Sequence, residues 1–467
     1  MNSDRHLNIV GGGLAGALLA SLLAQRGYFI DVYERRADPR LRSLDAGRSI
    51  NLALAARGLA ALQAAGLVHR IRPLLIPMRG RMIHQSGEAE QLLPYGSRPH
   101  EVIWSVSRAA LNAALIDAAA KHHAVRLHFE SACTAVDADA NTLRLRTASS
   151  AAGDSDSTAG EKLTPLYATV ATDGGGSAVR QSLALNGLLT VREDLLDHDY
   201  KELSIAALNG QPALDPNALH IWPRGGFMLI ALPNPDHSFT VTLFLAKHAN
   251  PGFSTLREPA AVQRFFTHYF PDLESLIPDR VSQFLSNPQG MLGTIHCSRW
   301  QVGRLLLLGD AAHAIVPFHG QGANCAFEDC LALVQLLDSH GLPPNTELET
   351  VFAEFERQRR PNTEAIAQMA LENYTEMRDT VRDDKFVRLK ALSLKLEQRH
   401  PTRFIPRYSM VMFHAEIPYA EALRRGAIQA TLLDDIDQRG HCSSDFALAD
   451  RLIVERLPPL PPAASAP

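Results

Sequence analysis

The composition and charge of the chain of 467 residues exclude several classes of protein. Hydrophobic residues make up 46% and charged residues 21% of the chain, which is the balance of a globular protein with two or three domains. The formal net charge of -4 argues against a general nucleic-acid binder. Small-molecule chemistry is therefore the leading expectation, with no nucleic-acid partner.

The cysteines and the N-terminus show no pattern for a metal, a disulfide framework or export. The five cysteines are scattered, without a C-x-x-C pair or histidines at zinc-ligand spacing. The N-terminal MNSDRH leads into an apolar strand without a basic and then apolar leader, and no window approaches eighteen uninterrupted apolar residues. We expect a cytoplasmic protein with reduced thiols, no metal and no membrane anchor.

The first motif is a glycine-rich turn between a strand and a helix. In LNIVGGGLAGALLASLLAQRGYFIDVYERR, a strand, the turn, a helix of about four turns and a second strand follow one another. Gly11, Gly13 and Gly16 fit G-x-G-x-x-G, whose glycines permit a tight turn, approach of the backbone to a pyrophosphate, and packing of the helix on the strand. Glu34 ends the second strand, where a carboxylate can accept hydrogen bonds from ribose hydroxyls. The motif predicts a dinucleotide site but does not distinguish NAD from FAD.

Two later turns between a strand and a helix carry acidic residues. ATVATDGGGSAVRQSL places Asp173 and Gly174 after a small apolar strand. GRLLLLGDAAHAIVPFHGQGANCAFEDCLAL places Gly309 and Asp310 after a buried strand and before a second helix. Either turn alone could be an acidic helix cap. The order and spacing of the three motifs together favour an FAD-binding unit.

The three motifs resemble those of the group A flavoprotein monooxygenases, aromatic hydroxylases that hold one FAD and use a loosely bound reduced nicotinamide. The resemblance extends from Asn8 to about Leu336, and Arg108 in WSVSRAALNAAL matches a family arginine that faces the FAD phosphates. The cofactor-binding residues that it implies are Gly11, Gly13, Leu14, Ala15, Gly16, Glu34, Arg35, Arg108, Asp173, Gly174, Gly309, Asp310, Gly322, Ala323 and Asn324.

The chain contains a single dinucleotide fingerprint, which bears on how the nicotinamide binds. An enzyme with a full second nicotinamide domain would show another fingerprint. We therefore expect the nicotinamide to bind in a surface groove. NADPH rather than NADH is implied by the family resemblance alone.

Further segments resemble the kynurenine-hydroxylating members of that family along nearly the whole chain. They are GRSINLALAARG, MRGRMIHQSGE, LLPYG, PFHGQGANCAFEDC, ALENYTEMRD and RFIPRYSMVMF. The implied reaction is hydroxylation of L-kynurenine by NADPH and O2 to 3-hydroxy-L-kynurenine, through a flavin hydroperoxide. The alternatives are a related hydroxylase of a phenolic acid or quinone, and a flavin redox sensor that docks a protein through its C-terminal helices. A homodimer is compatible with each of these.

The polar residues of GRSINLALAARG are unusual beside an apolar run that otherwise predicts the start of a buried helix. In a loop that enters the flavin side of a dinucleotide domain, Arg48 and Asn51 would shape the flavin and substrate cavity. The alternative is that they cap and staple the start of the helix.

A predicted β-hairpin supplies a candidate carboxylate clamp. PMRGRMIH and AEQLLPYG flank Ser86 and Gly87, so the turn brings Arg81 and Tyr95 close together. A planar guanidinium can form a bidentate pair with a carboxylate. The resemblance gives Arg81 and Tyr95 this role toward the carboxylate of kynurenine. The alternative is a solvated hairpin, in which Arg79 is the exposed arginine.

The segment HIWPRGGFMLIALPNPDHSFTVTLFLAKH alternates with period two and predicts two strands separated by PNPDHS. Met228, Ile230 and Leu232 would share one face, and Thr242 and Phe244 another. Such a sheet suits the wall of a pocket for an aromatic ring, although the same pattern describes an ordinary antiparallel core.

Beyond Pro361 the pattern changes to that of an amphipathic helix. In TEAIAQMALENYTEMRDTV the apolar stripe contains Asn373, an amide that needs a partner. The resemblance directs Asn373 toward the substrate, whereas a helix-packing amide bound to nearby backbone is the alternative. The predicted substrate-binding residues are Arg81, Tyr95, Asn373, Glu376, Tyr408, Phe318, Ile230, Leu232, Phe244 and Asn51, and His319 is the candidate catalytic group or a structural loop histidine.

These observations predict an α/β protein in three parts. An FAD-binding Rossmann-like (GR2-type) domain would comprise residues 1–75, 100–182 and 290–345. An inserted β-sheet substrate domain would comprise residues 76–99 and 183–289, and a C-terminal helical region, residues 346–467, would cover the active site. SSAAGDSDSTAGEK is small and polar, which predicts a flexible loop.

Overall fold

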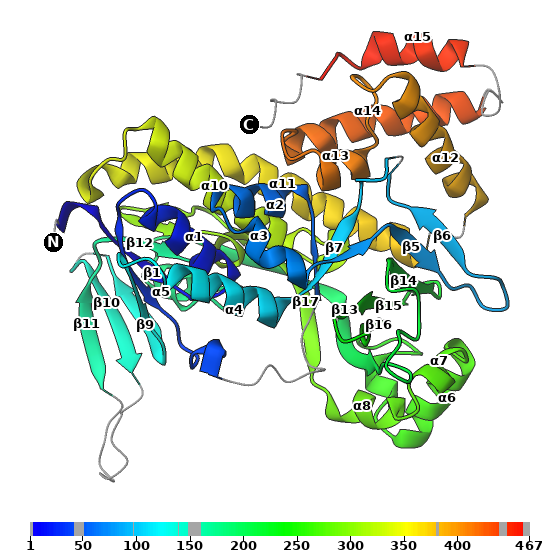
Figure 1. The fold of residues 1–467 in the computed structure, drawn as a ribbon, viewed down its shortest axis with the longest axis horizontal. Coiled ribbons are helices and arrows are strands. Elements are labelled where there is room, and N and C mark those ends of the chain that lie inside the picture. Colours follow the sequence, from blue (N-terminus) through cyan, green and yellow to red (C-terminus); the bar gives the residue numbers. More distant parts are fainter. Residues whose placement is uncertain are drawn as a thin grey trace.

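The computed structural model describes residues 3–41, 51–96, 98–138, 140–147, 160–379, 383–438 and 446–460. Figure 1 shows a nucleotide-binding part, a second sheet beside it, and a group of C-terminal helices that lies over the junction between them. The mixed α/β class is thereby confirmed. No helix among the described residues is long and apolar enough to cross a membrane.

A mainly parallel sheet is the centre of the nucleotide-binding part. Its order is β18-β19-β12-β1-β2-β8. The strands β19, β12 and β1 are almost completely buried, as parallel strands covered on both faces are. Because these three are neighbours, the turns that follow them meet at one edge of the sheet. The six strands are β1 (His6–Val10), β2 (Phe29–Tyr33), β8 (Val125–His128), β12 (Ala168–Ala171), β18 (Gln301–Val302) and β19 (Leu305–Leu307).

Helices and two small sheets surround this central sheet. Helix α1 packs against α4 and α10. It has 11 residues, or about three turns, and is shorter than the sequence predicts because Gln25 ends it. The helices are α1 (Leu14–Ala24), α2 (Ala56–Ala64), α3 (Val68–Ile71), α4 (Arg108–Ala119), α5 (Ala178–Leu185), α9 (Asp310–His313) and α10 (Gly322–Ser339). The small sheets contain β3 (Asn51–Leu54), β4 (Ile76–Met78) and β7 (Ile103–Ser107), and β9 (Ser131–Asp137), β10 (Thr142–Thr147) and β11 (Glu161–Pro165).

The predicted polar loop ends earlier in the structure than the sequence suggests. Strand β11 begins at Glu161, so the last two residues of SSAAGDSDSTAGEK pair with β10 instead of forming loop. Residues 149–159 of that segment lie outside the described residues.

The second sheet has seven strands in the order β17-β13-β16-β15-β14-β5-β6. The predicted hairpin is present as β5 and β6, with Arg81 opposite Leu93. Phenylalanines of residues 253–284, a segment that contains α6, α7 and most of α8, pack on one face of the sheet. The other face is turned toward the cavity described below. The elements are β5 (Gly80–Ile83), β6 (Gln91–Pro94), β13 (Val191–Ile205), β14 (Ala218–Pro223), β15 (Met228–Pro233), β16 (Phe239–Ala246), β17 (Gln289–Cys297), α6 (Pro259–Tyr269), α7 (Leu273–Leu276) and α8 (Arg280–Ser286).

Two details of this sheet correct the sequence-based expectation. Its alternating segment forms three strands, because Gly225 and Gly226 both have positive φ and turn the chain between β14 and β15. The register then pairs Met228 with Phe244 and Ile230 with Thr242. Directly paired side chains project to the same face. The residues of β15 and of β16 that the sequence placed on different faces therefore lie on the same face of the sheet.

The C-terminal region is helical, and α11 is its longest element. This helix begins at Leu348 and continues through Pro361, which the sequence suggested as its beginning. Its first turns bury Val351 and Phe352 in the nucleotide-binding core, and such packing can outweigh the hydrogen bond that proline removes. The helices are α11 (Leu348–Asp379), α12 (Asp384–Arg399), α13 (Arg407–Phe413), α14 (Tyr419–Gln438) and α15 (Ala447–Arg456).

Candidate active site

One cavity of about 1010 Å³ joins the motif edge of the nucleotide sheet to the open face of the second sheet. At one end it is lined by the turns after β1, β2 and β12. At the other end it is lined by β5, β15 and β16, by the segment 314–320, and by α13. A ligand that reaches from end to end would contact both halves of the molecule.

The glycine turn leaves room for a phosphate where the sequence predicts it. Gly11 has a φ of +105°, and a Cβ there would lie 2.6 Å from the carbonyl oxygen of Thr172. Gly13 is not strained, and a Cβ built on it meets no described atom within 4 Å. That space opens onto the cavity at the start of α1. The turn thus fits the pyrophosphate of a dinucleotide such as FAD, which would approach the backbone at Gly13.

Glu34 and Asp173 place two carboxylates in the nucleotide end. The Oε2 atom of Glu34 accepts a hydrogen bond from the Gly12 amide at 2.8 Å. Burial opposes its charge, but hydrogen bonds from Arg36 and Gly12 hold the pKa of Glu34 below its usual value. Burial raises the pKa of Asp173, whose buried Oδ1 atom has no hydrogen-bond partner among the described residues. Asp173 therefore keeps an acceptor for a ligand.

Most of the predicted cofactor-binding residues line the cavity, but three do not. Gly16 lies where α1 packs on the Gly11 carbonyl, and Gly309 has a positive φ of +62° before α9. Asn324 is fully buried, accepting a hydrogen bond from Ala55 N and donating to Ala53 O and Gly320 O. These three residues shape the backbone around the cavity. The residues that line it are Gly11, Gly13, Leu14, Ala15, Glu34, Arg35, Arg108, Asp173, Gly174, Asp310, Gly322 and Ala323.

Arg81 is the buried cation at the other end. Its side chain is 3% exposed and lines the cavity. One terminal nitrogen lies 2.9 Å from Glu376 Oε1, and the other donates to Asn373 Oδ1 at 3.3 Å. The Nε atom is buried without a hydrogen-bond partner among the described residues. Arg81 therefore retains donor capacity for a ligand carboxylate.

Three aromatic rings are stacked beside Arg81. The Tyr408 ring lies 5.7 Å from that of Tyr95 and 5.1 Å from that of His319, nearly parallel to both. The Arg81 guanidinium carbon is 4.8 Å from the centre of the Tyr408 ring. Burial, with the nearby Arg81, lowers the pKa of His319 to about 3, so its imidazole is neutral at pH 7. Its Nδ1 atom is buried without a hydrogen-bond partner among the described residues.

The apolar wall comes from the second sheet and the segment before α10. Ile230, Leu232 and Phe244 project from adjacent strands into the cavity. Phe318 meets Phe244 edge-on at 4.9 Å and stacks on Tyr374 at 3.8 Å. This surface is suited to one face of an aromatic ring.

Asn373 and Glu376 are close to the predicted clamp but do not line the cavity. Asn373 is 4% exposed, and its Nδ2 atom donates to the Phe318 carbonyl at 2.6 Å. Both residues contact Arg81 from the side of α11. The structure therefore places them behind the arginine, where they orient it.

Asn51 lines the cavity from the start of β3 and caps no helix. Its Nδ2 atom donates to Pro233 O at 2.9 Å and to Asn234 Oδ1 at 2.7 Å. It thus ties the nucleotide-binding part to the second sheet at the cavity wall. Arg48 lies outside the described residues.

Lys390 of α12 does not line the cavity, but its pKa responds to Arg81 and Glu376, a relation that sequence reasoning missed. Burial and the nearby Arg81 together lower the pKa of Lys390 to about 8, and Glu376 partly opposes them. The half-buried ammonium therefore lies within electrostatic reach of the clamp. Its sequence context, VRLKALSLKLEQR, is that of an ordinary amphipathic helix, and no local signal separates it from Lys395.

Comparison with known proteins places the chain in a family. A model of the FAD binding domain matches residues 5–369. The chain is 46% identical over 463 residues to "Kynurenine 3-monooxygenase" of Xanthomonas oryzae pv. oryzae (strain MAFF 311018), and 45% identical over 466 residues to the protein of that name from Stenotrophomonas maltophilia (strain K279a). Each match covers 98% of both proteins.

Solved structures with lower identity share the fold. They include 2-methyl-3-hydroxypyridine-5-carboxylic acid oxygenase, with a TM-score of 0.62 and 19% identity over 80% of this chain and 93% of that chain. P. aeruginosa PqsL in complex with 2-aminobenzoylacetate has a TM-score of 0.63 and 20% identity over 80% of this chain and 97% of that chain. Because the close relatives match over almost the full length, the chain belongs to the kynurenine 3-monooxygenase family of FAD-dependent flavoprotein monooxygenases.

Proposed function

We propose that this protein hydroxylates L-kynurenine to 3-hydroxy-L-kynurenine, consuming NADPH and O2 and producing NADP and water. The single observation that carries the proposal is the buried Arg81 at the aromatic end of a cavity that continues into the nucleotide site. An aromatic amino acid presents a ring and a carboxylate in that arrangement. We also propose that the protein acts in the cytoplasm and forms a homodimer.

Charge balance supports a carboxylate ligand at Arg81. The Arg81 cation already faces the Glu376 anion, so these two groups alone are neutral. Lys390, with a pKa of about 8, adds a positive charge at pH 7. The three groups together have a net charge of +1, which a substrate carboxylate neutralises. Such pairing offsets the cost of burying the carboxylate.

The aromatic groups orient the substrate ring and exclude water. Bound FAD supplies the redox chemistry, taking a hydride from NADPH and activating O2 for transfer to an aromatic carbon. Phe244 and Phe318 support one side of the ring, while Tyr408 and His319 close the carboxylate end. The neutral His319 can hold a proton at one nitrogen and accept at the other, and it adds no charge beside the ring. Burial of these groups keeps water from the reacting atoms.

The proposed activity has a direct test. Purified protein is expected to be yellow and to release one FAD per chain on denaturation. L-kynurenine should stimulate NADPH oxidation and yield a product heavier by one oxygen atom, measured by mass spectrometry. Stimulation by a phenolic acid or quinone instead would contradict the substrate assignment. Colourless protein that cannot be reconstituted with FAD would contradict the flavoprotein assignment.

The pKa of Lys390 predicts how substrate affinity depends on pH. Lys390 is charged below about pH 8 and neutral above it, so the site loses its net positive charge as pH rises through 8. The KM for L-kynurenine should therefore increase above pH 8. Lys390→Arg, which stays charged, should flatten this increase, and Lys390→Met should raise KM already at pH 7. Because the amino group of the substrate titrates equally in all three proteins, identical KM profiles would exclude Lys390 from the site.

A further inference from the structure

A fully buried arginine on α2 faces the end of a helix more than 350 residues away in the chain. Arg57 is 1% exposed. Its Nε atom donates to Val411 O at 3.2 Å, and one terminal nitrogen donates to His414 O at 3.3 Å and to Ile417 O. These carbonyls lie at the C-terminal end of α13 and in the turn beyond it. A cation at this position satisfies carbonyls that have no partner within the helix.

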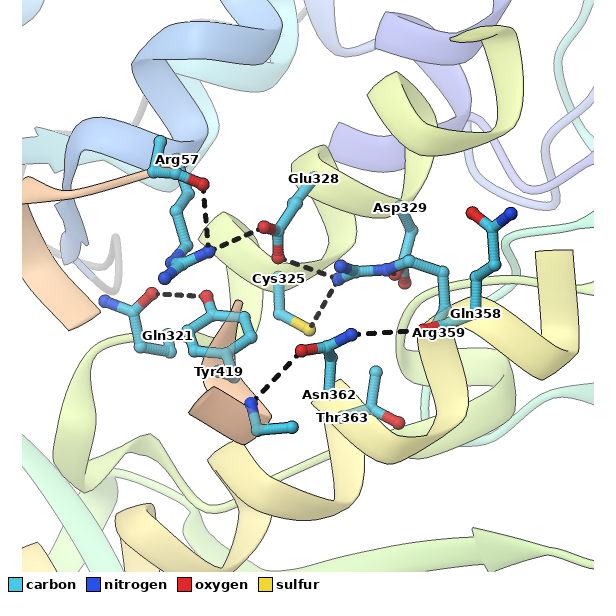
Figure 2. Close-up of polar contacts among 12 residues, drawn as sticks. Arg57, Gln321, Cys325, Glu328, Asp329, Gln358, Arg359, Asn362, Thr363 and Tyr419 are labelled. Atoms are coloured by element: carbon cyan, nitrogen blue, oxygen red, sulfur yellow. Dashed lines mark hydrogen bonds and ion pairs between the residues drawn. The ribbon is translucent and has the colours of Figure 1, made fainter. Parts of the chain in front are cut away.

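The charge of Arg57 is balanced by a network that crosses α10 and α11 (Figure 2). Glu328 accepts from Arg57 at 2.6 Å and from Arg359 at 2.8 Å. Arg359 also pairs with Asp329 at 2.8 Å, and Asp329 pairs with His313 at 2.7 Å. His313, Cys325 and Asp329 are close enough to hold a metal ion, but the Arg359 cation already occupies the Asp329 carboxylate. The cluster is therefore an ionic link between helices.

A second set of contacts connects the surroundings of Arg57 to the cavity. Gln321 is fully buried immediately before α10, and its Oε1 atom accepts from the Tyr419 hydroxyl at 2.7 Å. Its Nε2 atom lies 3.0 Å from the sulfur of Met412. Figure 2 shows the Tyr419 ring beside both Gln321 and the Arg57 guanidinium, whose carbon is 3.9 Å from the ring centre. Met412 and the neighbours of Gln321, Gly320 and Gly322, line the cavity.

We propose that Arg57 and Gln321 are positioning residues that hold α13 against the active-site cavity. Helix α13 contributes Tyr408 and Met412 to the cavity wall. Arg57 binds the end of this helix, and Gln321 joins Met412 to the turn before α10. The inference rests on the proposed function for the identity of the substrate, but its geometric claim concerns α13 alone.

The proposal has a defined chemical consequence. When α13 loosens, Tyr408 moves from the stack beside Arg81 and water enters the cavity. With FAD bound, the unproductive reaction NADPH + H⁺ + O2 → NADP⁺ + H2O2 would then replace hydroxylation. The positioning residues therefore control the fraction of NADPH used productively.

The contact of Arg57 with α13 needs the planar shape of the guanidinium as well as its charge. A guanidinium can donate to the carboxylate and to several carbonyls at fixed angles, whereas a lysine ammonium is a compact donor on a flexible stem. Arg57→Lys keeps the charge that balances Glu328, so it tests the geometry while avoiding an unpaired buried carboxylate.

A matched control is available in Arg425 of α14. Arg425 is also 1% exposed and donates to Arg403 O and to Pro458 O. These partners belong to the C-terminal helical region and not to the cavity wall. Arg425→Lys should therefore disturb a buried arginine of similar exposure without releasing α13 from α2.

The experiment combines coupling with local exchange in the FAD-bound protein. For Arg57→Lys we expect unchanged FAD content, a severalfold larger peroxide yield per NADPH in the presence of L-kynurenine, and faster amide hydrogen exchange in residues 407–417. Gln321→Leu, which removes only the link to Tyr419 and Met412, should show the same changes to a smaller extent. Arg425→Lys should leave peroxide yield and exchange in that segment at wild-type values.

Defined results would overturn the inference. Wild-type exchange at 407–417 in both Arg57→Lys and Gln321→Leu would do so, as would an equal rise in peroxide for Arg425→Lys. If Arg57→Lys does not fold, Gln321→Leu decides by the same two measurements. If the wild-type protein forms no product from L-kynurenine, the proposed function fails, while the exchange measurement still decides whether Arg57 holds α13.

Discussion

Replacing Arg81 by methionine is expected to weaken L-kynurenine binding by about 10- to 150-fold and to leave FAD content unchanged. A hydrogen bond to a charged group contributes about 1.5–3 kcal/mol, and each 1.4 kcal/mol is a factor of ten. Arg81 is buried beside the substrate end of the cavity and does not contact the glycine turn that fits the pyrophosphate. The measurement is the Kd for L-kynurenine from flavin absorbance changes, with released FAD quantified in parallel.

Two variants separate recognition from the stability of the site. Arg81→Met leaves Glu376 without its cation, so part of its effect would be a loss of stability. Adding Glu376→Gln should restore stability but not affinity. Arg79→Met is the control, because Arg79 is exposed and two residues away on the same hairpin. Equal affinities for wild type and Arg81→Met would remove Arg81 from substrate recognition.

The nucleotide end of the site could be predicted because its signals are local. Each motif lies within one strand and the turn that follows it, where glycine positions and burial follow directly from short-range geometry. The parallel pairing of β1 with β12 and of β12 with β19 then brings the three turns together. The sequence could not separate residues that line the cavity from residues that support it, since Ala323 and Asn324 are neighbours on one helix and only Ala323 lines the cavity.

The substrate end depends on contacts that no local pattern encodes. The common face of β15 and β16 follows from their register, and the register depends on the turn at residues 234–238. The positions of Asn373 and Glu376 behind Arg81 depend on how α11 crosses the second sheet. Arg57 could equally have been an exposed residue of an alanine-rich helix. Its burial follows from the packing of α10, α13 and α14 around it.

The glycine turn permits a second prediction, in which two similar substitutions have different effects. For Gly11→Ala we expect the protein without FAD to lose at least about 2 kcal/mol of stability, because its φ of +105° strains an alanine and its Cβ would lie 2.6 Å from the Thr172 carbonyl oxygen. The turn, and with it FAD binding, should be lost together.

Gly13→Ala should leave the stability of the fold unchanged and weaken FAD binding. A Cβ at this position meets no described atom within 4 Å, so the thermal midpoint of the FAD-free protein should stay near that of wild type. The same methyl group would occupy the space where a pyrophosphate approaches the backbone, and overpacking of this kind costs about 1–3 kcal/mol. FAD affinity, measured by fluorescence titration of the FAD-free protein, should fall by about 5- to 150-fold. Because Gly13 makes no contact that an alanine would break, a loss of affinity without a loss of stability can arise only from the ligand. Wild-type FAD affinity in Gly13→Ala would show that the pyrophosphate does not lie against this turn.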